Sequence, residues 1–304
     1  YLNQYQLLPQ KRTSEFFGDV FGRSVGEGTL NNFVSDCATA LGEFGQELKA
    51  GIGDSKVVHF DETKAMSGYW VHVASTGNMT YYAVHPNRGH KAMDEIGILP
   101  TFQGSAVHDG LVAYKKYPCR HVLCNAHHQR ELVAVKEDEN VEWAAQMLDF
   151  LHDVKKSVDE AKEKDNDCLE SKEIKNFEER YEKIVKTGFE AYPPEPISAV
   201  PIKKRGRKKQ SKGKNLLDRF KKNREQILAF MYDFKIPYDN NQAERDLRMI
   251  KLKIKISGTF RSKNGILNFC RIRSFISTMR KQGQRILQSL SNVFAGKSIA
   301  VQFT

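Results

Sequence analysis

The amino-acid sequence predicts a mixed α/β protein, with further helices on either side of its strand-rich part. Three short segments rich in β-branched and aromatic residues follow one another between residues 55 and 85, separated by turn residues. Strand-like and helix-like segments then alternate as far as about residue 124. Consecutive antiparallel strands followed by alternating helices and strands are typical of a mixed sheet covered by helices.

Each strand is short and bounded by turn residues. The strand segments are residues 56–61, 69–74, 80–84, 105–109 and 121–124. Thr76, Gly77 and Asn78 form the turn of a hairpin between the second and third strands. A short helix over residues 88–99 is expected between the third and fourth strands.

Helical patterns flank the strands. They occupy residues 1–50, 126–187 and 215–233, a segment that starts near residue 241, and residues 265–290. The first of these fits an ordinary helical hairpin, or the remnant of a helix-turn-helix. Residues 187–214 contain four prolines and a run of basic residues, and they predict a linker or loop.

Composition excludes several classes of protein. Forty per cent hydrophobic residues fit a globular chain, and no stretch approaches the roughly 18 apolar residues of a membrane helix. Five cysteines in 304 residues argue against a disulfide framework and for a reducing compartment. No secretory signal pattern opens the sequence, so we expect a cytoplasmic protein that does not bind membranes.

Charge is distributed unevenly along the chain. The net charge is +11, yet residues 201–304 carry 26 Lys and Arg against 6 Asp and Glu. Residues 1–200 carry 22 basic against 31 acidic residues. A basic half indicates a polyanionic partner such as nucleic acid, or only a solvated lysine-rich surface.

Two aspartates end predicted strands. Asp61 closes the first strand and Asp109 closes the fourth. If these strands are neighbours, both carboxylates emerge at one edge of the sheet and can share Mg²⁺ or Mn²⁺, which prefer oxygen ligands. Glu62 follows Asp61 directly, but strand alternation sends it to the opposite face. The alternative is two unrelated aspartates in turns.

A third acidic candidate is Glu244, within residues 238–248 (YDNNQAERDLR). With Asn241 as N-cap, Glu244 would occupy the third helical position and close a capping box, a role that needs no metal. The same carboxylate lies beside Arg245 and Arg248 in a basic stripe. Such surroundings are expected of a metal site that acts on the phosphodiester backbone of DNA.

A series of short motifs occurs in order along the chain. They are residues 59–63 (HFDET), 70–75 (WVHVAS), 88–93 (RGHKAM), 96–100 (IGILP), 108–110 (HDG), 124–132 (CNAHHQREL), 239–245 (DNNQAER) and 255–262 (KISGTFRS). Together they resemble the transposases of insertion-sequence family 66, from about residue 10 to about residue 290. On this resemblance, the sequence is the catalytic region without the amino-terminal zinc-binding part typical of the family.

The resemblance implies an RNase H-like core with a DDE triad. The matching catalytic and metal-binding residues are Asp61, Asp109 and Glu244. Asp61 and Asp109 are 48 residues apart, whereas Asp109 and Glu244 are 135 apart, so an insertion lies in the second interval. The expected parts are a helical segment over 1–50, the first part of the core over 51–139, a helical insertion with a basic, proline-containing linker over 140–215, and the last part of the core, with basic carboxy-terminal helices, over 216–304.

The chemistry implied is divalent-metal phosphoryl transfer. Three carboxylates would hold two Mg²⁺ or Mn²⁺ ions, so that water nicks the transposon end and the freed 3′-hydroxyl attacks target DNA. Two alternatives remain open. One is a non-catalytic DNA-binding protein derived from a transposase, and the other is a structure-selective nuclease on the same core.

A Cys-x-x-His element follows the second aspartate. Cys124 and His127 have side chains that bind zinc, but a structural zinc site draws four ligands from two separated pairs, and the second pair is missing. We therefore expect no zinc in this chain. The resemblance implies that Cys124 and His127 support the active site instead.

Basic residues that could contact DNA phosphates occur throughout the chain. The candidates are Arg88, Lys203, Lys204, Arg205, Arg207, Lys208, Lys209, Arg245, Arg248, Lys251, Lys255, Arg261, Arg271 and Arg273. Arg88 would be a phosphate clamp or only a surface turn residue, and residues 203–209 a mobile arm that tracks phosphates or only a solvated loop. We expect double-stranded DNA as partner, bound by a homodimer or higher oligomer in the bacterial nucleoid.

Overall fold

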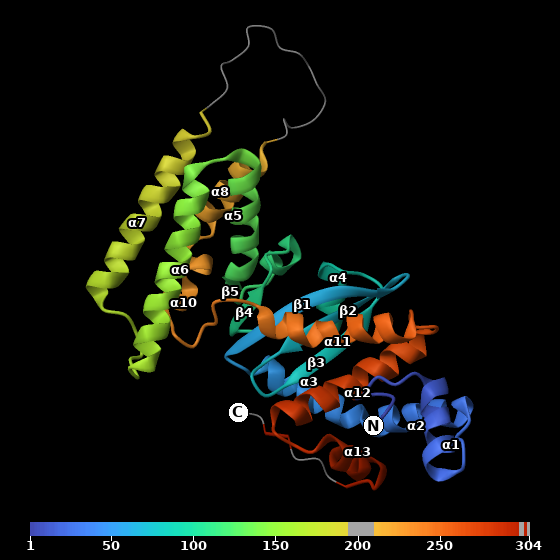
Figure 1. Ribbon diagram of the computed structural model, residues 1–304. Coiled ribbons are helices and arrows are strands. Elements are labelled where there is room, and N and C mark those ends of the chain that lie inside the picture. The colour runs from blue at the N-terminus through green and yellow to red at the C-terminus, as the bar shows by residue number, and fades with distance from the viewer. Residues whose placement is uncertain (194–209, 298–300, 303–304) are drawn as a thin grey trace, which may run out of the picture. The chain divides into compact units, whose positions relative to one another are not determined.

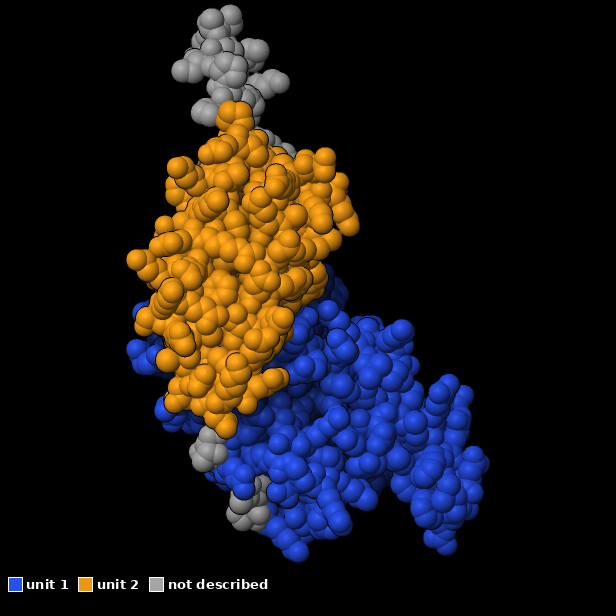
Figure 2. Space-filling view, turned by 60° about the vertical axis from the view of Figure 1, so that its left-hand side comes forward, with its two compact units in different colours: residues 1–121, 240–304 blue, residues 122–239 orange. Residues whose placement is uncertain are grey.

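The computed structural model describes residues 1–193, 210–297 and 301–302. The chain divides into two compact units (Figure 2): unit 1 combines residues 1–121 with residues 240–304, and unit 2 comprises residues 122–239. Unit 2 is therefore an insertion, in sequence, between two parts of unit 1. It begins after Asp109 and ends before Glu244, so all three predicted triad residues belong to unit 1.

A five-stranded mixed sheet forms the centre of unit 1, which confirms the predicted mixed α/β class. The strands are β1 (Val57–Met66), β2 (Tyr69–Ser75), β3 (Thr80–His85), β4 (Ser105–His108) and β5 (Arg120–Leu123). Their order is β3-β2-β1-β4-β5, with β1, β2 and β3 antiparallel and β4 parallel to β1. This arrangement is consistent with an RNase H-like core. The chain passes from unit 1 to unit 2 within β5.

The first strand is longer than the sequence indicated. We expected it to end at Asp61, but β1 continues to Met66 and pairs with β2 as far as that residue, with a register shift between Lys64 and Met66. The two strands are joined by a tight turn at Gly68, whose φ of +76° is unfavourable for other residues. Because the polar residues after Asp61 pair with β2, Asp61 lies inside the strand and not at its end.

Helices cover both faces of the sheet (Figure 1). Those of unit 1 are α1 (Gln10–Phe21), α2 (Glu27–Ala40), α3 (Gly42–Gly53), α4 (His90–Ile96), the 3₁₀ helix η1 (Val112–Lys116), α11 (Asn241–Ser257), α12 (Lys263–Lys281) and α13 (Ile286–Phe294). On one face, Phe60 lies in a core to which α2, α3, α12 and α13 contribute. On the other face, Val71 and Val73 share a second core with Leu247 and Ile250 of α11.

The outer strand β3 is covered by α12. The Ser274 hydroxyl accepts a hydrogen bond from the Tyr82 backbone N–H at 2.9 Å, and the Thr278 hydroxyl accepts one from Thr80 at 3.1 Å. Hydroxyl groups of a helix thus satisfy backbone donors that an edge strand would otherwise present to solvent. This fixes α12, and the sheet on which the acidic residues lie, as one packed body.

Unit 2 is helical. Its elements are α5 (Asn125–Glu139), α6 (Glu142–Glu163), α7 (Ser171–Glu190), α8 (Lys212–Lys222), α9 (Arg224–Ile227) and α10 (Ala229–Tyr232). Trp143, Met147, Phe150 and Val154 recur at three- and four-residue spacing on α6, and all are buried. This stripe supplies the apolar face that the helices of the unit share. Over the described residues, no helix of either unit has the length and apolar character required to span a bilayer.

Candidate active site

Asp61 and Asp109 are brought together by the register of β1 and β4. The two strands run parallel with a constant offset of 48 residues, from Val57 beside Ser105 to His59 beside Val107. Asp61 and Asp109 differ by the same 48 positions. Continuing the register two residues past His59 therefore places the two aspartates opposite each other, directly after the end of β4.

The loop after Asp109 holds its carboxylate in place. The Leu111 backbone N–H donates to Asp109 Oδ1 at 2.9 Å, and the Gly110 N–H donates to His108 Nδ1 at 3.0 Å. Gly110 has a φ of +93°, in the region that glycine tolerates best. A short glycine turn thus points the aspartate toward the cluster.

The carboxylate of Glu62 comes close to these aspartates, although Glu62 lies on the opposite face of β1 as the sequence predicts. Its backbone does face away from Asp61, as alternation requires, because it pairs with His72 while Asp61 pairs with Val73. A carboxylate oxygen of Glu62 nevertheless lies within 4.8 Å of ligand atoms of both Asp61 and Asp109. The pairing of β4 with β1 ends at His59, so Asp61 and Glu62 lie in the part of β1 that β4 no longer flanks, where their carboxylates come close to that of Asp109.

The cluster is electrostatically strained. Burial, together with the negative charges of Glu62, Asp109 and Glu244, raises the pKa of Asp61 to about 7. A hydrogen bond from the Glu62 backbone N–H opposes this rise. Glu244 is therefore near enough to Asp61 to act on its charge. Carboxylate oxygens gathered in this way fit the ligand preference of Mg²⁺ and Mn²⁺, and a bound cation would relieve their repulsion.

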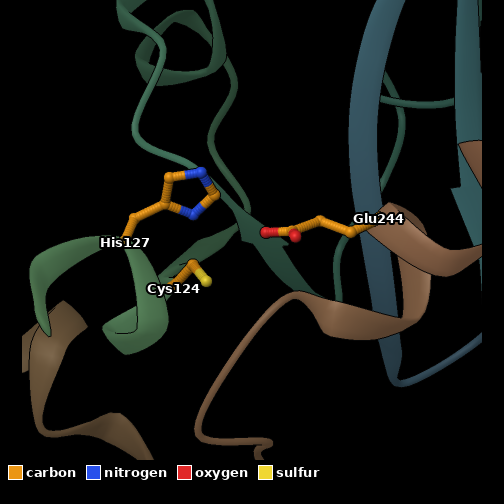
Figure 3. Close-up of side chains that lie close together, drawn as sticks. All are labelled: Cys124, His127 and Glu244. Carbon is orange, nitrogen blue, oxygen red and sulfur yellow. The ribbon is translucent and has the colours of Figure 1, made fainter. Parts of the chain in front are cut away.

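Glu244 is not part of a capping box. The helix α11 begins at Asn241 with Asn240 at the N-cap position, so Glu244 is the fourth helical residue and Ala243 the third. Figure 3 shows Glu244 extending from the first turn of this helix. The Asn240 side chain makes no capping bond to the helix. Its amide nitrogen donates to the Phe60 carbonyl at 2.9 Å, which ties the start of α11 to β1.

A partly buried ion pair holds the next turn of α11. Lys281 Nζ on α12 lies 2.9 Å from Asp246 Oδ2, and the same carboxylate accepts hydrogen bonds from Ser75 and Thr80 at 2.6 and 3.1 Å. Since Asp246 is two residues beyond Glu244, these contacts fix the height of α11 over the sheet. Sequence reasoning missed this pair, although an acidic residue on the apolar side of an amphipathic helix is a signal for one.

Cys124 and His127 lie in unit 2, at the start of α5. Cys124 is at the N-cap position and is buried, and the His127 backbone N–H donates to the Cys124 carbonyl at 3.2 Å (Figure 3). Cys124 and His127 therefore lie within one helical turn of each other, at the N-terminal end of α5.

The structure separates the predicted DNA-contacting residues into three groups. Exposed at the surface are Arg88, Arg245, Arg248, Lys251, Lys255, Arg261 and Arg271. Lys203, Lys204, Arg205, Arg207, Lys208 and Lys209 lie outside the described residues. Arg273 is only 2% exposed and its guanidinium lies 6.0 Å from the Tyr5 ring centre. Its place is in the interior and not at the surface where we expected it, because α12 is packed on several sides.

Comparison with protein families gives one result. The model named Transposase IS66 family matches residues 1–267. The chain belongs to this family. Comparison with curated proteins and with solved structures gave no match.

Membership gives the chain a transposase role and DNA as its partner. It also gives the acidic cluster a context, because transposases with three active-site carboxylates generally use divalent metals. Asp61, Glu62 and Asp109 are a group that could hold such an ion.

Proposed function

We propose that this transposase uses Asp61, Asp109 and Glu244 as a DDE triad for metal-dependent cleavage and strand transfer of DNA. The observation that carries the proposal is the shared offset of 48 residues, which sets Asp61 and Asp109 side by side. The charge of Glu244 is among those that raise the pKa of Asp61, which supports Glu244 as the third carboxylate.

The residues present fit two divalent cations. Bound there, the ions would activate water or a 3′-hydroxyl and stabilise the oxygen that leaves. The three carboxylates supply oxygen ligands and keep their negative charge once a cation offsets their repulsion. None of them needs to act as a nucleophile, so the protein's contribution is placement and charge.

Basic side chains around this cluster would bind the DNA backbone. Arg245, Arg248, Lys251 and Lys255 are exposed on α11, the helix that carries Glu244. A helix that combines the third carboxylate with a basic surface would bring phosphates to the triad. Such contacts give affinity that does not depend on base sequence.

The test is a nicking and strand-transfer assay on transposon-end DNA with Mg²⁺ or Mn²⁺. We expect Asp61→Asn, Asp109→Asn and Glu244→Gln each to lower the rate by at least about 100-fold, as loss of a charge-stabilising group does. Asp36→Asn, an exposed aspartate on α2, is the matched control. Full activity in the Asp61 and Asp109 variants would rule out the proposed triad.

Calorimetry with Mn²⁺ separates this proposal from a non-catalytic DNA-binding role. The proposed triad predicts Mn²⁺ binding that weakens in Asp61→Asn and in Glu244→Gln. DNA binding with no triad-dependent Mn²⁺ binding would favour a protein that holds DNA without cutting it.

A further inference from the structure

Glu62 is a buried carboxylate whose two oxygens are both engaged. Its side chain is 0% exposed. Arg88 Nε donates to Oε1 at 2.8 Å, and the Tyr114 hydroxyl donates to Oε2 at 2.8 Å. A buried charge requires such partners, and here one of them is a full positive charge.

Arg88 is held on two sides. Besides its bond to Glu62, the guanidinium lies over the Trp70 ring, 5.2 Å from the ring centre. The Nε bond uses one of the five N–H donors of a guanidinium. The Arg88 side chain is 43% exposed, so its guanidinium is held by Glu62 and Trp70 and is still accessible to solvent.

Tyr114 ties this pair to the loop of Asp109. Its ring is buried and stacks on the His108 ring at 4.4 Å, and His108 directly precedes Asp109. Burial and the charge of Glu62 hold the pKa of Tyr114 well above its usual value, so the hydroxyl remains a donor. Glu62 is thereby fixed by contacts that do not involve a metal.

We propose that Glu62 is a positioning residue that, with Tyr114 and Trp70, holds Arg88 as a preorganised binding group for a DNA phosphate beside the triad. This inference rests on the proposed function, since it names a phosphate contact of the same site. Arg88 is suited to the role because its planar fork can donate to Glu62 and to a phosphate at once.

Glu62 is a poor metal ligand on the same evidence. Its backbone faces away from Asp61, it is buried, and both of its oxygens accept hydrogen bonds. Pairing with Arg88 also offsets part of its charge. Two divalent cations are then matched by the three triad carboxylates and one phosphate diester, without a fourth carboxylate.

The experiment measures two affinities on the full chain. Mn²⁺ affinity is measured by calorimetry, and the affinity for a short duplex DNA is measured by fluorescence anisotropy in Ca²⁺ over a range of salt concentrations. The variants are Glu62→Gln, Arg88→Ala, Arg88→Lys, Tyr114→Phe and Asp61→Asn. Thermal melts confirm that each variant is folded.

We expect Glu62→Gln and Arg88→Ala to keep Mn²⁺ affinity within about threefold and to weaken DNA binding about five- to tenfold. The slope of log affinity against log salt should fall by about one, the value for one lost phosphate contact. The double variant Glu62→Gln, Arg88→Ala should bind DNA no more weakly than Arg88→Ala alone, because Glu62 acts through Arg88. Arg88→Lys should not restore binding, because lysine lacks the planar fork of N–H donors that can bind Glu62 and a phosphate at once.

Either of two results overturns the inference. Mn²⁺ affinity lost in Glu62→Gln as completely as in Asp61→Asn would make Glu62 a ligand, and the triad proposal would stand. Unchanged DNA affinity in both Glu62→Gln and Tyr114→Phe would show that Arg88 needs no anchor. Unchanged Mn²⁺ affinity in Asp61→Asn would instead contradict the proposed function, whatever Arg88 does.

Discussion

His59 and Asn240 are 181 residues apart in the sequence, yet their side chains meet in the interior of unit 1, with His59 Nδ1 2.9 Å from Asn240 Oδ1. A carboxamide oxygen only accepts hydrogen bonds, so His59 carries its proton on Nδ1. The other end of the Asn240 amide donates to Phe60. Asn240 therefore bonds to the two residues that precede Asp61 and stands four residues before Glu244.

This contact predicts that Asn240 controls the position of Glu244. Asn240→Ala removes a fully buried side chain with two hydrogen bonds, and we expect it to lower the free energy of unfolding by about 1–3 kcal/mol. We also expect nicking to fall more than stability accounts for, because the start of α11 is no longer tied to β1. Chemical denaturation and the nicking assay measure the two effects. Asn264→Ala, at the exposed start of α12, should change neither.

The strands near the two aspartates could be predicted from the sequence because they depend on local patterns. Strand segments and their turns are visible as short β-branched runs, and Asp109 follows the end of such a run, whereas Asp61 lies inside β1 and not at its end. The long interval between Asp109 and Glu244 likewise indicates an insertion, which we expect over residues 140–215, whereas unit 2 comprises residues 122–239.

Contacts between distant segments could not be predicted. Either Asn240 or Asn241 suits the N-cap of a helix, so the sequence does not distinguish them. The position of Asn240 before the helix depends on its bonds to β1, which lie far away in the sequence. The alternation of side chains along a strand correctly places Glu62 on the opposite face from Asp61. It does not determine how close the carboxylate of Glu62 comes to the neighbouring carboxylates. Arg273 has the basic neighbours of a surface residue, and its burial depends on the packing around α12.

The partly buried pair of Asp246 and Lys281 should be important for stability. Lys281→Met removes the ammonium and leaves Asp246, whose side chain is 15% exposed, without its cation, so the cost should lie below the about 3–5 kcal/mol of fully buried pairs. The double variant Asp246→Asn, Lys281→Met should cost less than the sum of the single variants, because it leaves no unpaired charge. Urea denaturation measures these values. Lys255→Met, exposed on α11, is the control, and additive costs would contradict the coupling.

His128 should make the stability of unit 2 depend on pH. Its side chain is buried, and burial, followed by the positive charge of Arg219, lowers its pKa from 6.5 to about 3. The native state therefore keeps His128 neutral while the unfolded state takes up a proton below pH 6.5. The contribution of His128 to the free energy of unfolding should be constant above that pH and fall by about 1.4 kcal/mol per pH unit below it.

The variant His128→Gln tests this assignment. It should reduce the pH dependence of unfolding between about pH 5 and pH 6.5, because the group that takes up the proton is gone. His152→Gln, at an exposed site on α6, should leave the dependence as it is in the wild type. An unaltered slope in His128→Gln would assign the pH dependence to other groups.

The basic run at residues 203–209 should contribute to DNA affinity without taking part in catalysis. Replacing Lys203, Lys204, Arg205, Arg207, Lys208 and Lys209 with Ser removes six positive charges. If all six contact phosphates, the slope of log affinity against log salt falls by about five, and partial engagement gives a smaller change. Binding should weaken alike for all DNA sequences, because phosphate contacts carry no base information. Nicking at saturating DNA should remain near the wild-type rate, since the triad belongs to unit 1. An unaltered salt dependence would show that this run makes no contact with DNA.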